Sequence, residues 1–395
     1  MKQLPNSEIE QIYKKAISAG LIEKSEKSAI FYVKEMLQDR LSILHRCFPA
    51  DVLHAVAIKA QSHPEVLKSI VDFGFGLEAA SLEEVKMAVA AGCPAHKIVF
   101  DSPVKTREEI QYCHEHVKGL YLNVNSLQEL ERIPTNFSGK LGIRINPLVQ
   151  TDAPEFFDVV RKNSKFGVSI LKENEIIAAA LQCPAVTGLH MHIGSGIRDF
   201  SGNVEAVKMI VNLAEKINLK RAKNVINSRI DWIDIGGGIH FESETGDFSV
   251  AEFVDKLKSE TNLFNNFEVI TEYGAFVHKQ NSFAVSRIEY VLESELKDIP
   301  HSAFIHFGAD LFLRKVYSSL PINYPYFVFG KTAEPNFAKY NIAGPLCFAG
   351  DYLYYDLELP KLEEGDLFVM KDIGANTLSM WSRHCSREEP KFVLI

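Results

Sequence analysis

The chain alternates short apolar runs with longer stretches in which apolar residues recur every three or four positions. Between about residues 50 and 275, eight of these runs have the length and composition of buried strands. They are LHAVAIK (53–59), FGLEAA (75–80), KIVFD (97–101), GLYLN (119–123), KLGIRIN (140–146), VTGLHMHIG (186–194), IDWIDIGG (230–237) and EVITEYG (268–274). The stretches between them have helical spacing. In NVEAVKMIVNLAEKI, for example, one helix face would carry Val204, Val207, Val211, Ala214 and Ile217.

Strands that alternate with helices need crossover connections, which make a sheet parallel and bury both of its faces. Eight such units in about 225 residues fit a (β/α)8 barrel, which is close to the usual size of that fold. An open, doubly wound sheet is the alternative that the pattern leaves. We expect the barrel, over residues 46–275.

The pattern changes after residue 275, where the helical period weakens. The segments SFAVSRIEYVL, YPYFVFG, GDLFVMKDI and PKFVLI are β-branched or aromatic and are separated by turn residues. They predict a second, mainly β domain over residues 276–395. Near the N-terminus, NSEIEQIYKKAISAG predicts a helix and AIFYV a strand, so residues 1–45 are expected to form a segment that partly joins the β domain.

Composition narrows the class of protein. Hydrophobic residues make up 46% of the chain and charged residues 24%, as in ordinary globular proteins. A net charge of −8 argues against nucleic acid or an anionic membrane surface as the main partner. The polar start MKQLPNSEIEQ lacks the apolar centre of an export signal, so we expect a cytoplasmic protein. The six cysteines lack C-x-x-C spacing, which is typical of separate reduced thiols.

Two strand ends carry residues that suit chemistry on a cofactor, because parallel barrels bind ligands at the C-terminal ends of their strands. The first strand ends at Lys59, after the apolar run AVAI. Burial there is expected to lower the pKa of the amine, as a lysine that forms a Schiff base requires. The eighth strand ends at Glu272, which could hold a pyridine nitrogen protonated. A solvated lysine and a structural ion pair are the alternatives.

The sixth strand ends in HMHIGSG. Alternate residues of a strand share a face, so His190 and His192 are expected to point the same way. Gly194 and Ser195 follow in a turn that can hydrogen-bond an anion. Structural histidines and a paired-histidine metal site compete with this interpretation. No matching carboxylate cluster accompanies the pair in the sequence, so no metal is expected.

The seventh strand runs into three glycines, Gly236, Gly237 and Gly238. Without side chains in the way, their backbone N–H groups can approach a phosphate closely. A triple glycine is also a common turn. Its place after the seventh strand favours the phosphate, because phosphate sites in these barrels favour the loops after strands seven and eight.

The order of these motifs resembles that of the fold-type III pyridoxal-phosphate decarboxylases, which act on diaminopimelate, ornithine, arginine or carboxynorspermidine. The resemblance runs from about residue 30 to the C-terminus. The matching segments are AVAIKAQSHPEVLKSIVDFGFGLEAASLEEV, KFGV (165–168), HMHIGSG, IDIGGG, Gly344 to Asp351, and GANTLSM (374–380). The resemblance implies a TIM barrel of the alanine-racemase-like type, pyridoxal 5'-phosphate as cofactor, decarboxylation of an amino acid, and a homodimer with shared active sites.

The resemblance also implies roles for particular residues. Lys59 would be joined to the cofactor, and Glu272 would pair with its pyridinium nitrogen. The remaining cofactor contacts would come from His192, Ser195, Gly236, Gly237, Gly238, Gly274 and Asn376. Arg314 would contact the substrate. Cys347 would reach the neighbouring subunit's site and return a proton to Cα.

Three positions depart from the family pattern. Ala275 replaces an arginine and Asn376 a tyrosine that both help to bind the phosphate, so we expect either weaker cofactor affinity or a substitute donor. Phe348 stands where the family places an acidic residue for the substrate's distal amine. From this change we expect free ornithine, lysine and diaminopimelate to be poor substrates, since an unpaired ammonium costs several kcal/mol. Arg383 and His384 could supply positive charge for a differently charged substrate.

Two other functions fit the same scaffold. A racemase would use the cofactor for other chemistry at Cα, but racemases place a weaker acid, typically an arginine, where this chain has Glu272. A non-catalytic homologue acting as a binding partner is the second alternative. The presence of both Lys59 and Cys347 argues against it.

Overall fold

The computed structural model describes residues 4–239, 250–296, 298–318, 322–331 and 336–395. The chain divides into two compact units. One comprises Gln38–Val277, and the other combines Met1–Leu37 with His278–Ile395. Each unit has its own sheet, and the two are described separately below.

The first unit is a closed barrel of eight parallel strands. In chain order the strands are β2 (Leu53–Ala57), β3 (Gly76–Ala79), β4 (Ile98–Phe100), β5 (Tyr121–Val124), β6 (Lys140–Asn146), β8 (Val186–His190), β9 (Trp232–Asp234) and β10 (Glu268–Thr271). Each pairs with the next in parallel, and β10 pairs with β2, which closes the ring. A ninth, two-residue strand, β7 (Val168–Ser169), adds to β6. All eight sequence-predicted strands are present, and the doubly wound alternative is wrong.

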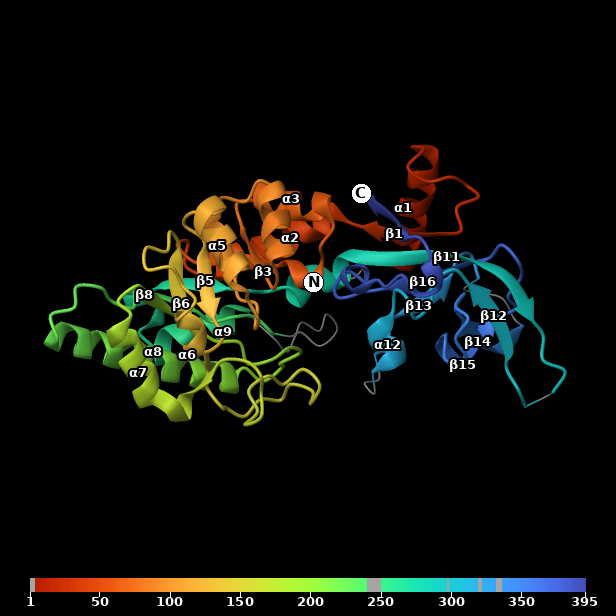
Figure 1. Ribbon diagram of the computed structural model, residues 1–395. Helices are drawn as coiled ribbons and strands as arrows, with labels where there is room; N and C mark the ends of the chain where they lie inside the picture. The colour runs from red at the N-terminus through yellow and green to blue at the C-terminus, as the bar shows by residue number, and fades with distance from the viewer. Residues whose placement is uncertain (1–3, 240–249, 297, 319–321, 332–335) are drawn as a thin grey trace. The chain divides into compact units, whose positions relative to one another are not determined.

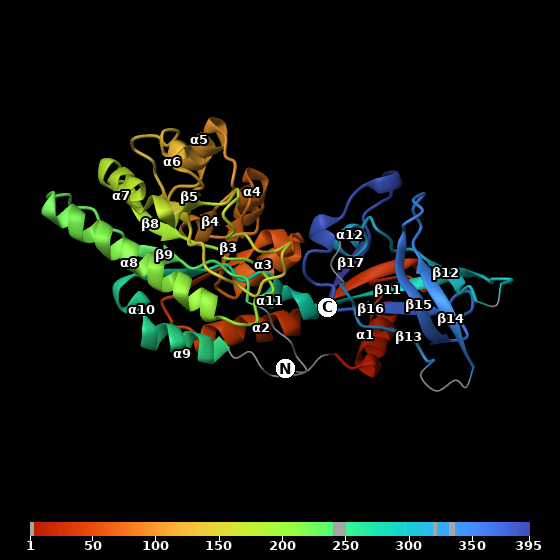
Figure 2. The same cartoon turned by 90° about the horizontal axis from the view of Figure 1, so that it is seen from below.

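Helices surround this barrel (Figures 1 and 2). They are α2 (Lys34–Cys47), α3 (Pro64–Asp72), α4 (Leu82–Ala90), α5 (Arg107–His116), α6 (Leu127–Leu130), α7 (Glu173–Gln182), α8 (Ser201–Lys223), α9 (Val250–Glu260), α10 (Leu263–Asn266) and α11 (Ala275–His278). The long helix α8 buries the five apolar residues that the spacing predicted for its inner face. Burial of this stripe, rather than helix propensity, is what fixes such a helix on its sheet.

The interior of the barrel is filled by an indole ring. Trp232 on β9 is fully buried, and its ring lies over Gly142 of β6 and Gly188 of β8. A Cβ at Gly188 would lie 1.9 Å from the ring, so the two glycines make room for it. The barrel is therefore a packed core, and its polar groups lie at the C-terminal ends of its strands.

The second unit is built on an eight-stranded, mainly antiparallel sheet with the order β13-β16-β11-β12-β14-β15, in which β1 also pairs with β11 and with β17. Its strands are β1 (Ser28–Tyr32), β11 (Ser282–Leu292), β12 (His301–Ile305), β13 (Tyr326–Val328), β14 (Phe337–Ala343), β15 (Tyr352–Pro360), β16 (Leu367–Lys371) and β17 (Lys391–Leu394). Helices α1 (Asn6–Ser18) and α12 (Leu313–Tyr317) belong to it. The predicted mainly β character is confirmed.

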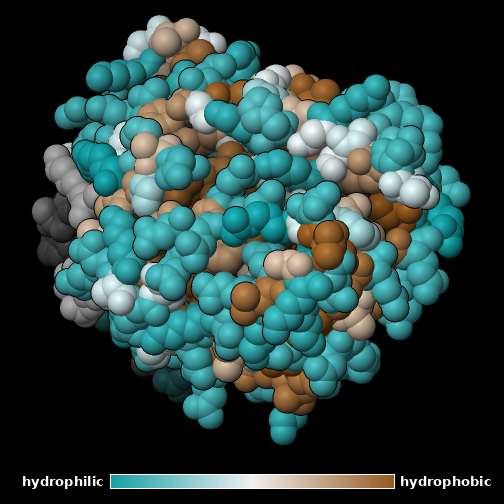
Figure 3. All heavy atoms as spheres, turned by 90° about the vertical axis from the view of Figure 1, so that its left-hand side faces the viewer, coloured by the Kyte–Doolittle hydropathy of each residue, from teal (hydrophilic) through white to brown (hydrophobic). Residues whose placement is uncertain are grey.

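The outer surface agrees with the composition. The face drawn in Figure 3 is mainly hydrophilic, with apolar residues in small separate groups. Within the described part of the chain, every helix is too short or too polar to cross a membrane.

Candidate active site

The C-terminal ends of the barrel strands bring together a group of charged and polar side chains that are scattered in the sequence. Each comes from a different strand or the residue just after it. They are Lys59 after β2, Glu78 on β3, Asp101 after β4, Arg144 on β6, His190 on β8, Asp234 on β9 and Glu272 after β10. All except Lys59 are buried. A parallel barrel produces this arrangement directly, because all of its strands end on the same face.

Lys59 lies in a short 3-10 turn (Ile58–Ala60) that follows β2, and its ammonium forms an ion pair with Glu78. Solvent reaches 47% of its side chain. The low-dielectric surroundings lower the pKa of Lys59, but the carboxyl groups of Glu78, Asp101 and Glu272 raise it more, and the net pKa lies above its ordinary value. The expected lowered pKa was wrong because it considered burial alone. Three neighbouring strands supply the negative charge.

Glu78 and Asp101 share a hydrogen bond and divide their charge unequally. Burial raises the pKa of Glu78 well above its ordinary value, and the charge of Lys59 opposes this only in part. Burial also raises the pKa of Asp101, but Lys59, the hydrogen bond from Glu78 and Arg144 outweigh it, and the net pKa is low. Arg144 Nη1 lies 3.4 Å from Asp101 Oδ2. Asp101 is therefore the stronger acid of the two, and Glu78 is the carboxyl group that takes up a proton more readily.

Glu272 follows β10, the strand that pairs with β2, and is 4% exposed. Burial and the charge of Asp101 raise its pKa to about 7, although Lys59, Arg144 and a hydrogen bond with Asp234 lower it. Burial and Glu272 raise the pKa of Asp234 well above its usual range, so Asp234 is the protonated donor. Its Oδ1 also accepts from the Gly236 N–H at 2.8 Å. Glu272 can thus exist as a carboxylate near neutral pH.

His192 and the three glycines form the turn beside Glu272. Strand β8 ends at His190, so the predicted alternation does not extend to His192. His192 Nδ1 accepts from the Gly237 N–H at 3.1 Å, which leaves its proton on Nε2. Burial keeps the pKa of His192 well below its ordinary value, so the ring is neutral. The N–H groups of Gly236 and Gly237 donate hydrogen bonds to Asp234 and His192. The predicted binding of a phosphate by these glycines stays a prediction.

This turn is shaped for close approach. Gly236 and Gly238 have φ of +66° and +97°, which side chains rarely adopt. A Cβ at Gly238 would lie 1.9 Å from the Gly194 carbonyl, and one at Gly237 would lie 2.4 Å from the Glu272 carbonyl. Ser195, half-buried, follows Gly194 on the facing loop. Gly274 packs on the other side, where a Cβ would lie 2.8 Å from Ala60 Cβ, next to Lys59.

The residues present fit a flat, phosphorylated aldehyde cofactor. The group contains an accessible amine and a glycine turn without side chains. Glu272 Oε1 and both ring nitrogens of His190 are buried without a hydrogen-bond partner in the described structure. Such groups are costly unless a ligand satisfies them. These residues could hold pyridoxal phosphate, and the role of each toward it stays a prediction.

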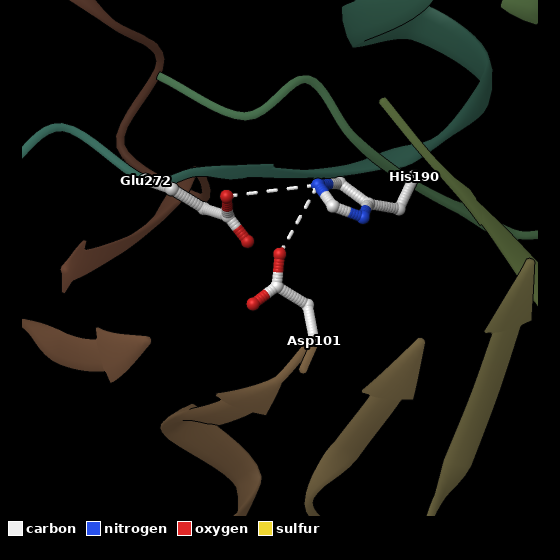
Figure 4. Close-up of side chains that lie close together, drawn as sticks. All are labelled: Asp101, His190 and Glu272. Atoms are coloured by element: carbon white, nitrogen blue, oxygen red, sulfur yellow. Dashed lines mark ion pairs between the residues drawn. The ribbon is translucent and has the colours of Figure 1, made fainter. Parts of the chain in front are cut away.

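The sequence argument against a metal rested on the absence of carboxylates near the histidines, and that premise was wrong. Asp101 and Glu272 both lie beside His190, and ligand atoms of the three residues fall within 4.8 Å of one another (Figure 4). The same carboxylates also have cationic neighbours within the protein, Lys59 and Arg144. These two cations therefore compensate the negative charge of the carboxylates without a metal ion.

The remaining predicted site residues belong to the β unit. Cys347 is exposed, in a turn held by Asp351, whose carboxylate accepts the N–H groups of Ala309 at 2.6 Å and Leu346 at 2.8 Å. Phe348, next to Cys347, stacks on Tyr317 of α12 with ring centroids 5.4 Å apart.

Two more predicted residues lie in the same unit. Arg314 belongs to the short helix α12, and burial lowers the pKa of its guanidinium. Asn376 has a φ of +56°, a conformation that asparagine tolerates better than most residues. The roles of Arg314, Cys347, Phe348 and Asn376 stay predictions.

Sequence reasoning missed Glu78, Asp101, Arg144 and Asp234 as site residues. Each interrupts or ends an otherwise apolar strand, in FGLEAA, KIVFD, KLGIRIN and IDWIDIGG. A charged residue in a strand buried on both faces needs a partner, and that was the signal available. The pairings could not be read from the sequence because every partner comes from another strand.

Comparisons with known proteins identify the family. The family model described as the pyridoxal binding domain of pyridoxal-dependent decarboxylases matches residues 34–279, and the model of their C-terminal sheet domain matches residues 301–374. The chain is 29% identical over 378 residues to diaminopimelate decarboxylase of Aquifex aeolicus, covering 92% of this chain and 85% of the relative. It is 29% identical over 381 residues to the enzyme of the same name from Bacteroides thetaiotaomicron, covering 91% and 93%.

Solved structures share the fold. Diaminopimelate decarboxylase from Helicobacter pylori, complexed with L-lysine, superposes with a TM-score of 0.83 at 22% identity and covers 96% of this chain and 94% of its own. Lysine/ornithine decarboxylase from Vibrio vulnificus, complexed with putrescine, superposes with a TM-score of 0.81 at 19% identity and covers 99% of each chain.

These relatives contradict one expectation. We predicted from Phe348 that diaminopimelate, lysine and ornithine are poor substrates, yet the curated relatives that match nearly the whole chain are named diaminopimelate decarboxylases. The prediction was wrong because it assigned the distal amine to a single position. Diaminopimelate has a carboxylate as well as an ammonium at its distal end, and several residues can share such a group.

With matches to both domain models across most of its length, the chain belongs to the pyridoxal-dependent decarboxylase family and is a carboxy-lyase that uses pyridoxal phosphate.

Proposed function

We propose that the protein removes one carboxylate of diaminopimelate as carbon dioxide and leaves lysine. The observation that carries the proposal is the match to diaminopimelate decarboxylases over 92% of the chain. The barrel supports it, because an accessible amine, Lys59, and a buried acid, Glu272, belong to the same group of polar side chains at the ends of its strands. A cytoplasmic location is part of the same proposal.

The barrel residues have distinct parts in this function. Lys59 would hold the cofactor covalently, and Glu272 would pair with its ring nitrogen. When bound, pyridoxal phosphate withdraws the electron pair that the departing carboxylate leaves at Cα. The carboxylate of Glu272 stabilises the protonated nitrogen on which this withdrawal depends. Asp234, as the hydrogen-bond donor to Glu272, keeps that carboxylate in place.

The ion pair of Lys59 with Glu78 bears on how the amine becomes available. An ammonium is not a nucleophile, so Lys59 would have to lose a proton before it could hold an aldehyde cofactor covalently. Glu78 pairs directly with the ammonium and has a raised pKa, so it is the group placed to accept that proton. Solvent access to the Lys59 side chain leaves room for the cofactor to reach the amine.

We also propose that the active unit is a homodimer in which Cys347 of one subunit returns a proton to Cα in the site of the other. The exposure of Cys347 in a turn fixed by Asp351 supports this. Mixing inactive Lys59→Ala and Cys347→Ala proteins should restore about a quarter of wild-type activity, since about half of the dimers would be mixed and each mixed dimer would hold one intact site of its two. A mixture that stays inactive contradicts the shared site.

The substrate is tested with purified holoenzyme. Carbon dioxide release is measured with diaminopimelate, lysine, ornithine and arginine, and lysine formation from diaminopimelate is followed by mass spectrometry. We expect kcat/KM for diaminopimelate to exceed that for each other amino acid at least about tenfold, or about 1.4 kcal/mol of transition-state discrimination. The Lys59→Ala protein is the control for uncatalysed release.

Two outcomes contradict the proposal. One is efficient turnover of ornithine, arginine or lysine with slower turnover of diaminopimelate. The other is carbon dioxide release from diaminopimelate that is equal in the wild type and in Lys59→Ala.

A further inference from the structure

His190 is the buried side chain at the centre of the acid cluster. It ends β8, is fully buried, and directs Nε2 toward two carboxylates, of Asp101 and Glu272, which follow β4 and β10 (Figure 4). Nε2 lies 3.6 Å from Glu272 Oε2 and 3.8 Å from Asp101 Oδ2. Neither ring nitrogen has a hydrogen-bond partner in the described structure. The mechanism above does not use this residue.

The proton on the imidazole has one favourable position. Burial lowers the pKa of His190 to about 4, although Asp234 and Asp101 raise it, so the ring is neutral and carries a single N–H. If that hydrogen were on Nδ1, the lone pair of Nε2 would face two carboxylates. With the hydrogen on Nε2, the N–H dipole points at both of them. Electrostatics therefore selects the Nε2–H form.

The charges around His190 are nearly balanced. The acids that face it are Asp101, Asp234 and Glu272, and the cations are Lys59 and Arg144. Asp234 is held protonated, which leaves Asp101 and Glu272 to bear the negative charge. These two carboxylates repel each other, since the charge of Asp101 raises the pKa of Glu272. A donor placed between them reduces that repulsion.

We propose that His190 is a positioning residue, which directs its Nε2–H between Asp101 and Glu272 and so holds Glu272 ionised and aimed at the ring nitrogen of the cofactor. This role concerns the cofactor and holds whichever amino acid is the substrate. Glu272 acts directly on the ring, and His190 acts through Glu272.

The proposal has a specific consequence. Without the Nε2–H, the two carboxylates lose the donor between them, and Glu272 takes up a proton at higher pH. The ring nitrogen then loses its anionic partner, and electron withdrawal weakens. Substrate contacts are not involved, so the effect falls on kcat rather than on KM.

Two substitutions and one control test this. His190→Leu removes the donor, and His190→Gln replaces it with an amide N–H that cannot titrate. His54→Gln is the matched control: His54 is buried in the same barrel, but its Nδ1 bonds Thr271 Oγ1 at 2.7 Å and faces none of these acids. For each holoenzyme we measure kcat, KM, the pH titration of the bound cofactor's absorbance, and the melting temperature.

We expect His190→Leu to lower kcat about tenfold, because two buried carboxylates lose an N–H dipole 3.6 Å and 3.8 Å away, with little change in KM. The pH titration of the cofactor absorbance should move to higher pH. His190→Gln should recover most of kcat and restore the titration. His54→Gln should leave both unchanged, whatever it does to the melting temperature.

The proposal is overturned if His190→Leu changes the melting temperature but neither kcat nor the cofactor titration. If the leucine variant fails to fold, nitrogen NMR of the wild-type holoenzyme with labelled histidines can show which ring nitrogen of His190 carries the proton. We expect the His190 proton on Nε2, and a proton on Nδ1 contradicts the role. The zinc ion alone provides a last check. Tight binding of one zinc per chain that depends on His190 and displaces the cofactor would make the cluster a cation site instead.

Discussion

Replacing Glu272 with glutamine isolates the charge that faces the cofactor. The side chain keeps its length and one acceptor oxygen but can no longer be an anion. Glu272 is 4% exposed, and its pKa of about 7 means that the wild-type group is a carboxylate above neutral pH. The substitution therefore leaves a protonated ring nitrogen without its buried counter-charge.

The size of the effect follows from that burial. Removing one partner of a buried ion pair costs about 3–5 kcal/mol. Asp101 is an anion in the same cluster, and its charge offsets part of the loss, so we expect the lower end of this range. About 3 kcal/mol corresponds to roughly a hundredfold fall in kcat/KM.

The matched control lies on the same strand. Glu268, at the opposite end of β10, is 60% exposed and pairs with Lys140 at 2.6 Å. Exposed pairs contribute little, so Glu268→Gln should leave kcat/KM within about twofold of wild type. Both variants are assayed at pH 8 by carbon dioxide release, with cofactor content measured by absorbance. A Glu272→Gln enzyme with full cofactor content and activity within threefold of wild type refutes the reasoning.

The remaining predictions concern stability and the site's scaffold. In the cofactor-free protein, the raised pKa of Glu272 means that its ionisation destabilises the folded state as the pH rises from about 4.5 to 7. Glu272→Gln should therefore melt at a higher temperature than the wild type at pH 8, and this difference should become smaller toward pH 5. Gly238→Ala, with its Cβ 1.9 Å from a carbonyl, should lose cofactor and melt lower than Gly365→Ala, which has a similar positive φ but open space; equal melting temperatures contradict the clash. Asp351→Asn should lower the free energy of unfolding by about 1–3 kcal/mol and should lower kcat, because it loosens the turn that carries Cys347. The control is Asp356→Asn, at an exposed position, which should change neither quantity. Denaturant unfolding and rate measurements check both variants.

The barrel could be predicted from the sequence because its strands are buried on both faces. A segment such as KLGIRIN must be apolar along most of its length, and helical spacing between such runs leaves few arrangements. Lys59 and Glu272 were found for the same reason, since polar residues at the ends of apolar strands stand out. The structure shows both at the site.

What the sequence could not show were the relations between strands. The pKa of Lys59 was predicted in the wrong direction because Glu78, Asp101 and Glu272 lie 19 to 213 positions away along the chain. The carboxylates beside His190 were missed for the same reason. The substrate prediction failed differently: it derived the chemistry of a whole substrate from Phe348 alone.

The central claim is that the amine after the first barrel strand holds the cofactor. Reduction of the holoenzyme with borohydride makes that linkage permanent, and peptide mass spectrometry then locates it. We predict that the cofactor's mass is found on Lys59, with loss of activity in proportion. Label on another lysine, or a fully reduced and inactive protein in which Lys59 is unmodified, would contradict the account.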